Sequence, residues 1–352
     1  MSDPVPHSRP TLGPRERDAV DAVITTGQVA QGPQAAALER DLSGWFHREG
    51  SVAVGSGSQA LLAALQALGV GPGHRVAISA FTCPAVLYAV QWSGAEPVLL
   101  DTAEGSLAPS LRQLEEAGEM DACILVHPWG YPLDAVPWTE AVPVLVEDAA
   151  ASAGARWEGR PVGSSGRVSI LSFYATKMLC AGEGGAVLSD DPGLIERVRR
   201  LRDYDDGEGE LKRFNFKMTD LQAAMARVQL TRLGEFLERR ASRARRYDLE
   251  VEGMGLVPVR VEEEARPAFF RYLCWSPVDV GTLTGRCQQQ GVFCRRPVPV
   301  PLYRLTGGPE LPNSREAWHH LVSLPLYPTL TEGEQTRVLE VLNDVLEEEG
   351  GG

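Results

Sequence analysis

The sequence lacks the features that mark membrane, secreted, metal-binding and nucleic-acid-binding proteins. No apolar run approaches the ~20 residues that cross a bilayer, and residues 1–10 are polar rather than signal-like. The net charge is -13, and no long basic stripe is present to neutralise nucleic-acid phosphates. The six cysteines lack the paired spacing of metal sites, and most lie in apolar contexts typical of a reducing compartment. We therefore expect a cytoplasmic protein that binds no metal, membrane or nucleic acid.

The sequence does have the composition of a globular enzyme, with 43% hydrophobic and 23% charged residues among 352. Short apolar runs alternate with helical patterns, which predicts an α/β fold with a mixed, mostly parallel sheet covered by helices. The expected strands are 52–54, 76–78, 97–100, 124–126, 144–146, 169–173 and 186–188. A single long helix is expected from residue 220 to about 248.

This pattern also predicts a division of the chain. We expect an N-terminal tail (1–12), a large domain (13–237), a smaller C-terminal α+β domain (238–347) and a disordered tail (348–352). Ligands of mostly parallel sheets bind beyond the carboxyl ends of the strands, so functional residues are sought there.

Two segments at strand ends have the chemistry of a cofactor site. The loop Gly55-Ser56-Gly57-Ser58 opens a helix, where free backbone N–H groups and the helix dipole attract phosphate. Asp148 follows the apolar run 144–146 and precedes three alanines, which are small enough for a flat ring to lie against. Taken alone, each segment also has an ordinary interpretation, as a small-residue turn and as a helix-capping aspartate.

Lys177 is the most informative residue, because it follows an otherwise apolar strand and precedes the turn Gly182-Glu183-Gly184-Gly185. A partly buried amine has a lowered pKa and attacks aldehydes more readily than a solvated amine does. Ser172 lies five residues earlier, where its hydroxyl is placed to help hold a phosphate. The order of cradle, carboxylate and lysine predicts a pyridoxal 5'-phosphate (PLP) site, with Lys177 as Schiff-base partner and Asp148 beside the ring nitrogen.

These segments together resemble the DegT/DnrJ/EryC1/StrS aminotransferases. The resemblance covers nearly the whole chain, in order, and its motifs are Gly57-Ser58-Gln59-Ala60-Leu61, Glu147-Asp148-Ala149-Ala150, Ser172-Phe173-Tyr174-Ala175-Thr176-Lys177, Phe214-Asn215-Phe216-Lys217-Met218 and Ser323-Leu324-Pro325-Leu326-Tyr327-Pro328. It implies the fold-type I architecture of PLP-dependent transferases and a homodimer with active sites at the subunit interface. Members typically aminate keto groups of nucleotide-linked sugars or of cyclitols, in secondary-metabolite or surface-sugar biosynthesis.

The resemblance also implies roles for individual residues. Lys177 and Asp148 would be catalytic, and Asn215 would reach the phosphate of the neighbouring subunit's cofactor. The residues expected to bind the cofactor within one subunit are Gly57, Ser58, Gln59, Cys83, Asp148, Ala150, Ser172 and Lys177. By analogy, Arg295, Arg296 and Tyr327 are candidate substrate contacts, although the two arginines could equally be surface loop residues. We expect an aminotransferase that moves nitrogen from glutamate or glutamine onto a keto sugar or keto cyclitol.

Three positions depart from the family's pattern. Cys83 stands where an aromatic ring usually stacks on the cofactor, Ala151 where glutamine or histidine is common, and Arg213 where glycine is usual. Two alternatives therefore stay open. One is a PLP-dependent dehydratase or lyase that transfers no nitrogen, although that branch replaces the lysine by histidine. The other is a non-catalytic, PLP-binding regulatory homologue.

Overall fold

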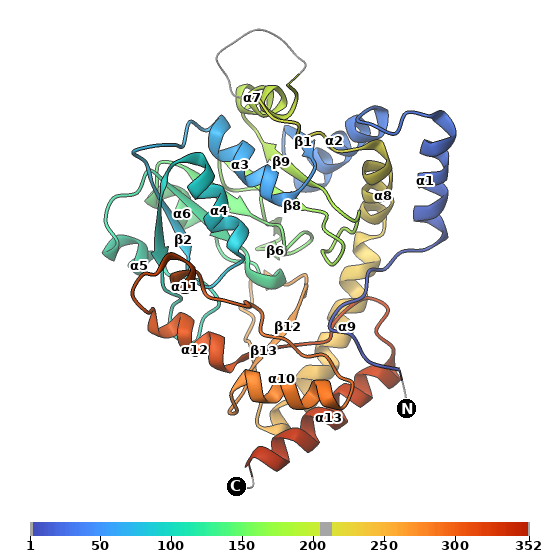
Figure 1. Ribbon diagram of the computed structural model, residues 1–352, viewed down its shortest axis with the longest axis vertical. Helices are drawn as coiled ribbons and strands as arrows, with labels where there is room; N and C mark the ends of the chain where they lie inside the picture. Colours follow the sequence, from blue (N-terminus) through green and yellow to red (C-terminus); the bar gives the residue numbers. More distant parts are fainter. Residues whose placement is uncertain (1–2, 205–212, 351–352) are drawn as a thin grey trace.

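The computed structural model describes residues 3–204 and 213–350, and a seven-stranded sheet forms its centre (Figure 1). The strands lie in the order β1-β9-β8-β5-β4-β2-β3, and all of them except β9 run in the same direction. Their bounds are β1 (Gly50–Val54), β2 (Arg75–Ser79), β3 (Glu96–Leu100), β4 (Ala122–Val126), β5 (Leu145–Asp148), β8 (Val168–Ser172) and β9 (Gly185–Ser189). This sheet confirms the predicted α/β class and all seven expected strands.

Helices cover both faces of the sheet because its strands alternate their side chains between two apolar surfaces. Val76 and Ile78 of β2 pack with one group of helices, while Ala77 packs on the opposite side. The first group is α3 (Gly57–Ala67), α4 (Pro84–Ser93) and α7 (Pro192–Arg202). The second is α2 (Pro33–Phe46), α5 (Leu111–Glu116), α6 (Val136–Ala141) and α8 (Asp220–Thr231), and α1 (Pro14–Thr26) packs on α8.

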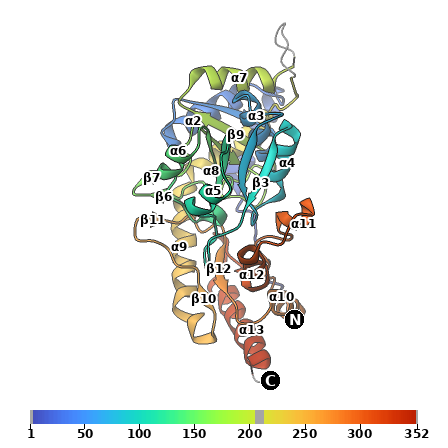
Figure 2. The ribbon, with the colours of Figure 1, turned by 90° about the vertical axis from the view of Figure 1, so that its left-hand side faces the viewer.

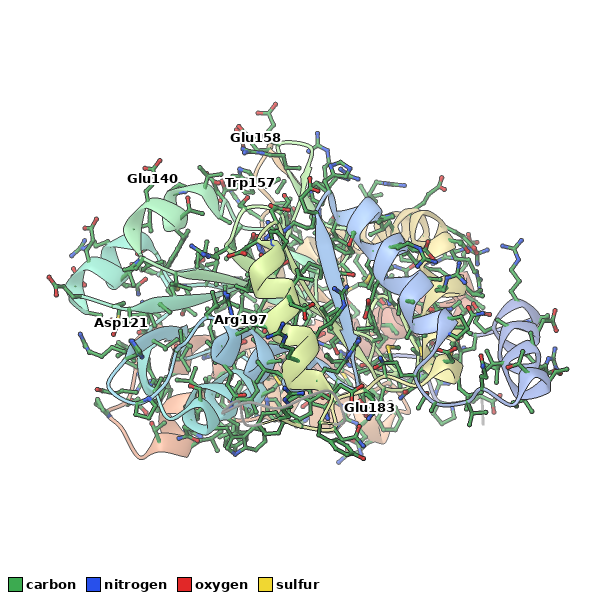
Figure 3. The ribbon with its side chains drawn as sticks, turned by 90° about the horizontal axis from the view of Figure 1, so that it is seen from above. Asp121, Glu140, Trp157, Glu158, Glu183 and Arg197 are labelled. Carbon is green, nitrogen blue, oxygen red and sulfur yellow. The ribbon has the colours of Figure 1, made fainter. Side chains whose placement is uncertain are left out.

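The view from above shows α7 crossing one end of the sheet (Figure 3). Arg197 of α7 donates through Nε to the carbonyl of Ala67, the last residue of α3, at 2.8 Å. This bond satisfies one of the carbonyls that a helix leaves without an intrahelical partner. It also ties α7 to α3, whose opposite end reaches the carboxyl edge of the sheet.

The prediction of a single long helix from 220 to 248 is wrong, because the structure has two helices there. α8 ends at Thr231 and α9 (Leu233–Glu250) begins two residues later, with Arg232 between them. The guanidinium of Arg232 pairs with Glu16 at 2.9 Å and with Glu235 at 3.2 Å. Because a one-residue break barely changes the apolar period, the sequence pattern did not reveal it. The predicted domain boundary at 237/238 falls within α9 and stays a prediction.

A smaller group of elements lies below the main sheet, beside the lower half of α9 (Figures 1 and 2). Its antiparallel sheet has the order β10 (Val257–Pro258), β12 (Tyr272–Trp275), β13 (Leu321–Leu324). Its helices are α10 (Val280–Gln289), α12 (Pro312–His320) and α13 (Glu332–Gly350), whereas α11 (Leu302–Thr306) packs through Leu302 on the core of the main sheet. A third sheet joins β11 (Ala265–Arg266) to β6 (Arg156–Trp157) and β7 (Arg160–Pro161), and short 3-10 turns lie at η1 (Pro128–Gly130) and η2 (Glu252–Met254).

Both predicted tails include described residues. Val5, within the expected 1–12 tail, is buried, and its backbone pairs with Gly291 and Phe293. At the other end α13 continues to Gly350, within the expected 348–352 tail. Residues 1–2, 351–352 and the acidic stretch 205–212 lie outside the described residues. Among the helices that the structure does describe, none is both long and apolar enough to span a membrane.

Candidate active site

A cavity of about 530 Å³ opens at the carboxyl ends of the parallel strands. Register explains the convergence, because Asp148 ends β5 beside Ile170 of β8, and Ser172 ends β8. The polar or charged side chains that line the cavity are Ser56, Ser58, Thr82, Cys83, Asp148, Ser172, Tyr174, Lys177, Glu183 and Arg271. Its apolar walls come mainly from Leu61, Val86, Val126, Pro128, Trp129, Ile170, Phe270 and residues 297–299.

The first turn of α3 forms an anion-binding corner of this cavity. Ser56 caps the helix, and its Oγ accepts from the backbone N–H of Gln59 at 3.2 Å. The N–H groups of a helix's first turn have no intrahelical acceptor, and the helix dipole favours negative charge there. Gly57 allows the corner to close on Ser172, since a Cβ on Gly57 would lie 2.9 Å from the Ser172 Cβ. The two halves of the predicted phosphate cradle are therefore in contact.

Asp148 lies at the floor of the cavity, with only 5% of its surface exposed. Its Oδ1 accepts from the backbone N–H of Ala150 at 2.9 Å. Burial raises the pKa of Asp148, while that hydrogen bond and the positive charge of Lys177 oppose the rise. A cationic group bound beside this carboxylate would therefore favour its charged form.

Lys177 enters the same cavity from the turn after β8, where its backbone N–H donates to Tyr174 O at 2.8 Å. Burial lowers the pKa of its ammonium, and the charge of Asp148 opposes that effect. Its Nζ lies 5.0 Å from the centroid of the Phe270 ring. No carboxylate of the described residues lies within the 4 Å of an ion pair from this Nζ. Amine and acid thus line one cavity without forming an ion pair.

A buried polar network behind Asp148 holds the strand end in place. Glu147 is 1% exposed, and its carboxylate accepts from His127 Nε2 at 2.8 Å and from the N–H groups of the loop 163–166. His127 Nδ1 accepts from the Leu133 N–H, which assigns the proton to Nε2. The backbone N–H of His127 donates to the backbone carbonyl of Asp148 at 3.0 Å. Neither residue was predicted as functional, because adjacent acids at a strand end give no signal of which one faces inward.

The structure brings most of the predicted site residues together. Gly57, Ser58, Cys83, Asp148, Ala150, Ser172 and Lys177 all line the cavity. Gln59 borders a neighbouring cavity instead, and Asn215 is exposed, so their predicted roles stay predictions.

The three candidate substrate contacts lie elsewhere. Arg295 is exposed, Arg296 pairs with Asp279 at 3.3 Å, and Tyr327 is fully buried with its hydroxyl 3.3 Å from Glu334. None of the three lines the cavity in this chain.

Several lining residues were missed by sequence reasoning. Trp129 and Phe270 supply aromatic walls, and Arg271 supplies a second cation beside Lys177. The segment Pro297-Val298-Pro299 forms a further wall, and its proline-rich sequence was the only signal that it is a rigid element. No group of three or more His, Cys, Asp or Glu side chains able to hold a metal ion occurs among the residues that the structure describes.

The cavity fits the cofactor expected from the sequence. Its volume suits a small-molecule site, and its walls combine an anion-binding corner, a buried acid and an amine. Flat surfaces are available at Ala150 and Trp129, although Cys83 rather than an aromatic residue begins α4. A phosphate, a ring nitrogen and an aldehyde therefore each find a complementary group.

Comparisons with known proteins show which family the chain resembles. A model of the DegT/DnrJ/EryC1/StrS aminotransferase family matches residues 10–343. A dTDP-3-amino-3,4,6-trideoxy-alpha-D-glucose transaminase of Streptomyces venezuelae is 31% identical over 343 residues, 93% of this chain and 90% of that protein. The aminotransferase TlmJ from Streptoalloteichus hindustanus has a similar structure, with a TM-score of 0.92 at 27% identity over 98% of this chain and 100% of TlmJ. DesV of S. venezuelae, solved in complex with a ketimine intermediate, has a TM-score of 0.89 to this chain, with 29% identity over 94% of each chain.

Proposed function

This chain belongs to the DegT/DnrJ/EryC1/StrS aminotransferase family, a PLP-dependent family, and we propose that it transfers an amino group to the keto group of a nucleotide-linked sugar. The proposed amino donor is glutamate or glutamine. The observation that carries this proposal is the meeting of Lys177, Asp148 and the start of α3 in one cavity. A keto cyclitol is the alternative acceptor within the same proposal.

The residues of the cavity would divide the cofactor between them. The N–H groups at the start of α3, with Ser58 and Ser172, would hold the phosphate, and Asp148 would face the ring nitrogen. When bound, PLP supplies an aldehyde carbon that bonds to amines and a ring that withdraws electrons from the neighbouring carbon. Trp129 and Phe270 would shield that chemistry from water.

Lys177 would act as the base that moves the proton. Burial lowers the pKa of its amine, so a larger neutral fraction is available near neutral pH than for a solvated lysine. Asp148 would act on the ring nitrogen by a charge effect. A carboxylate in this buried position favours a proton on any nitrogen that it faces, and that proton increases the electron demand of the ring.

The relatives support the choice of acceptor. The Streptomyces venezuelae relative is named as a transaminase of a dTDP-linked deoxy sugar. Beyond Asp148 and Lys177, only Glu183 and Arg271 are charged among the described residues that line the cavity. A largely neutral, partly aromatic pocket suits a deoxygenated sugar, whose ring has few hydroxyl groups to satisfy.

We also propose that the enzyme is a homodimer in which Asn215 reaches the partner's cofactor phosphate. The support is surface chemistry: Asn215 is exposed, and the stacked rings of Tyr88 and Trp92 are 41% and 65% exposed. A second cavity of about 520 Å³ beside Trp92 shares Ser56 and Ser58 with the first, so a partner seated there would touch the cradle. Light scattering tests this, and a monomeric mass for the active enzyme would contradict it.

The absorbance of the bound cofactor tests the amino transfer itself. The protein with PLP should show a visible band that glutamate or glutamine removes and that a keto acceptor restores. Lys177→Ala should lose the band, whereas the matched control Lys217→Ala should keep it. A wild-type band that neither donor alters would contradict the proposed function and favour elimination chemistry.

A further inference from the structure

One cation of the active-site cavity has no acidic partner. Arg271 precedes β12, lines the cavity and is half-buried. No carboxylate among the described residues lies within ion-pair distance of its guanidinium, and its one side-chain hydrogen bond is a 3.4 Å contact with Phe270 O. Burial lowers the pKa of Arg271 to about 10, so its charge is poorly solvated yet remains at neutral pH. Such a cation is stabilised by an anionic ligand.

The backbone around Arg271 is fixed by unusual local geometry. The backbone N–H of Arg271 donates to the backbone carbonyl of Trp129 at 3.0 Å, and the backbone N–H of Ala268 donates to the backbone carbonyl of Gly130 at 2.8 Å. Trp129 (φ 48°) and Phe269 (φ 47°) both adopt left-handed conformations that non-glycine residues rarely take. A Cβ on Gly130 would collide with the backbone N of Phe270, so this docking also requires a glycine. The two strained segments hold one another and determine where the side chain of Arg271 starts.

Phe270 sets the position of the guanidinium relative to the reactive amine. Arg271 Cζ lies 4.0 Å from the Phe270 ring centroid, and Lys177 Nζ lies 5.0 Å from the same centroid. The backbone carbonyls of Phe269 and Phe270 accept from the guanidinium of the buried Arg240, and these bonds fix the backbone that carries the Phe270 ring. Burial lowers the pKa of Lys177 most and Asp148 raises it, and the charge of Arg271 is a smaller cause that lowers it further. The two cations are therefore close enough to interact.

We propose that Arg271 binds the α-carboxylate of the amino donor. The proposal rests on the proposed aminotransferase function and names the group that recognises one of its substrates. In an α-amino acid, the amine and the carboxylate share one carbon, so a donor whose nitrogen approaches Lys177 places its carboxylate nearby. A guanidinium without a counter-ion gains two parallel, charge-assisted hydrogen bonds from that carboxylate.

The diphosphate of a nucleotide-linked acceptor is the other oxyanion that could meet Arg271. The sugar ring separates that diphosphate from the reacting keto carbon, whereas the α-carboxylate is bonded directly to the reacting carbon of the donor. The closeness of Arg271 to Lys177 therefore favours the carboxylate. The α-carboxylate is also common to glutamate and glutamine, so one arginine would serve either donor.

Binding of α-methylglutamate to the holoenzyme tests the assignment. This donor analogue lacks the proton that the reaction removes, so a spectral titration yields a dissociation constant without turnover. We expect Arg271→Gln to weaken binding by about tenfold to a hundredfold, the loss of a charge-assisted pair. Arg271→Lys should lose less, and the control Arg245→Gln, which is exposed on α9 and outside the cavity, should bind as the wild type does. Binding of 4-aminobutyrate, which has no α-carboxylate, should not change in any variant.

The other outcomes are distinct. Calorimetry with thymidine diphosphate forms the second arm of the test. If Arg271→Gln binds thymidine diphosphate more weakly but binds α-methylglutamate as the wild type does, Arg271 recognises the diphosphate and the carboxylate assignment is wrong. Unaltered binding of both ligands to Arg271→Gln would overturn a ligand role altogether. A wild type that binds none of the donors would defeat the proposed function, and this assignment with it. The cofactor band and the thermal midpoint of each variant show that it is folded and loaded.

Discussion

Replacement of Glu147 by glutamine tests how the acid of the active site is held. Glu147 precedes Asp148 on β5, and its buried carboxylate accepts from His127 and from three backbone N–H groups of the loop 163–166. Glutamine has nearly the same shape but carries an NH₂ group in place of one oxygen. That group cannot accept, so at least one N–H donor of the loop loses its partner.

The pKa of Glu147 gives the size of the effect. Burial alone would raise it, but the hydrogen bond from His127 and the N–H groups of Gly166 and Gly163 outweigh burial and lower it from 4.5 to about 2. A tenfold change in proton affinity is worth about 1.4 kcal/mol, so this lowering corresponds to about 3 kcal/mol of folding free energy at neutral pH. Because the folded-state pKa is the lower one, this stabilisation is complete above pH 4.5 and is lost as the pH falls towards 2.

Urea unfolding at one fixed protein concentration measures this difference. Glu147→Gln should be less stable than the wild type by about 3 kcal/mol at pH 7, and the gap should narrow at pH 3. The matched control is Glu140→Gln, because Glu140 is exposed on α6 and projects away from the core (Figure 3). Equal midpoints for the two variants at pH 7, or a gap that stays constant down to pH 3, would refute the reasoning.

Three further predictions concern the cofactor. Asp148→Asn should retain PLP but lose turnover by on the order of a hundredfold or more, and steady-state rates near those of the wild type would contradict its role at the ring nitrogen. Gly57→Ala should raise the PLP dissociation constant about tenfold, because the added methyl group forces Ser172 away, and should change the free energy of unfolding by less than about 1 kcal/mol. Absorbance titration and urea unfolding measure the two quantities, and an unchanged PLP dissociation constant would contradict the prediction. The rate at which the apoprotein captures PLP should rise with pH around a midpoint below 10.5, because burial lowers the pKa of Lys177. Stopped-flow mixing should place that midpoint higher in Arg271→Gln, and an unmoved midpoint would count against the repulsion between the two cations.

The frame of the site could be predicted because it depends on local patterns. Strands buried on both faces are continuously apolar, so β4 and β5 were visible as short runs between helices. Parallel pairing of β5 with β8 then brings the carboxyl ends of these strands, with Asp148 and Ser172, to one edge of the sheet. The small residues of the loop before α3 completed the pattern.

The walls of the site could not be predicted, because long-range docking sets them. Trp129 and Phe270 are about 140 positions apart, and only the hydrogen bonds between their segments bring both into the cavity. Arg240 belongs to a run of arginines at 239, 240, 243, 245 and 246 on α9, yet it is 4% exposed and donates to backbone carbonyls. Sequence spacing carries no information on which arginine of such a run turns inward.

The attachment of PLP to a lysine is the central claim, and reduction with borohydride followed by peptide mass mapping tests it most directly. The chain has three lysines, at 177, 212 and 217, so the assignment is unambiguous. We expect the added mass of the reduced cofactor on the peptide that contains Lys177 and on no other. Added mass at Lys212 or Lys217, or an unmodified chain after reduction of the PLP-loaded protein, would contradict the account.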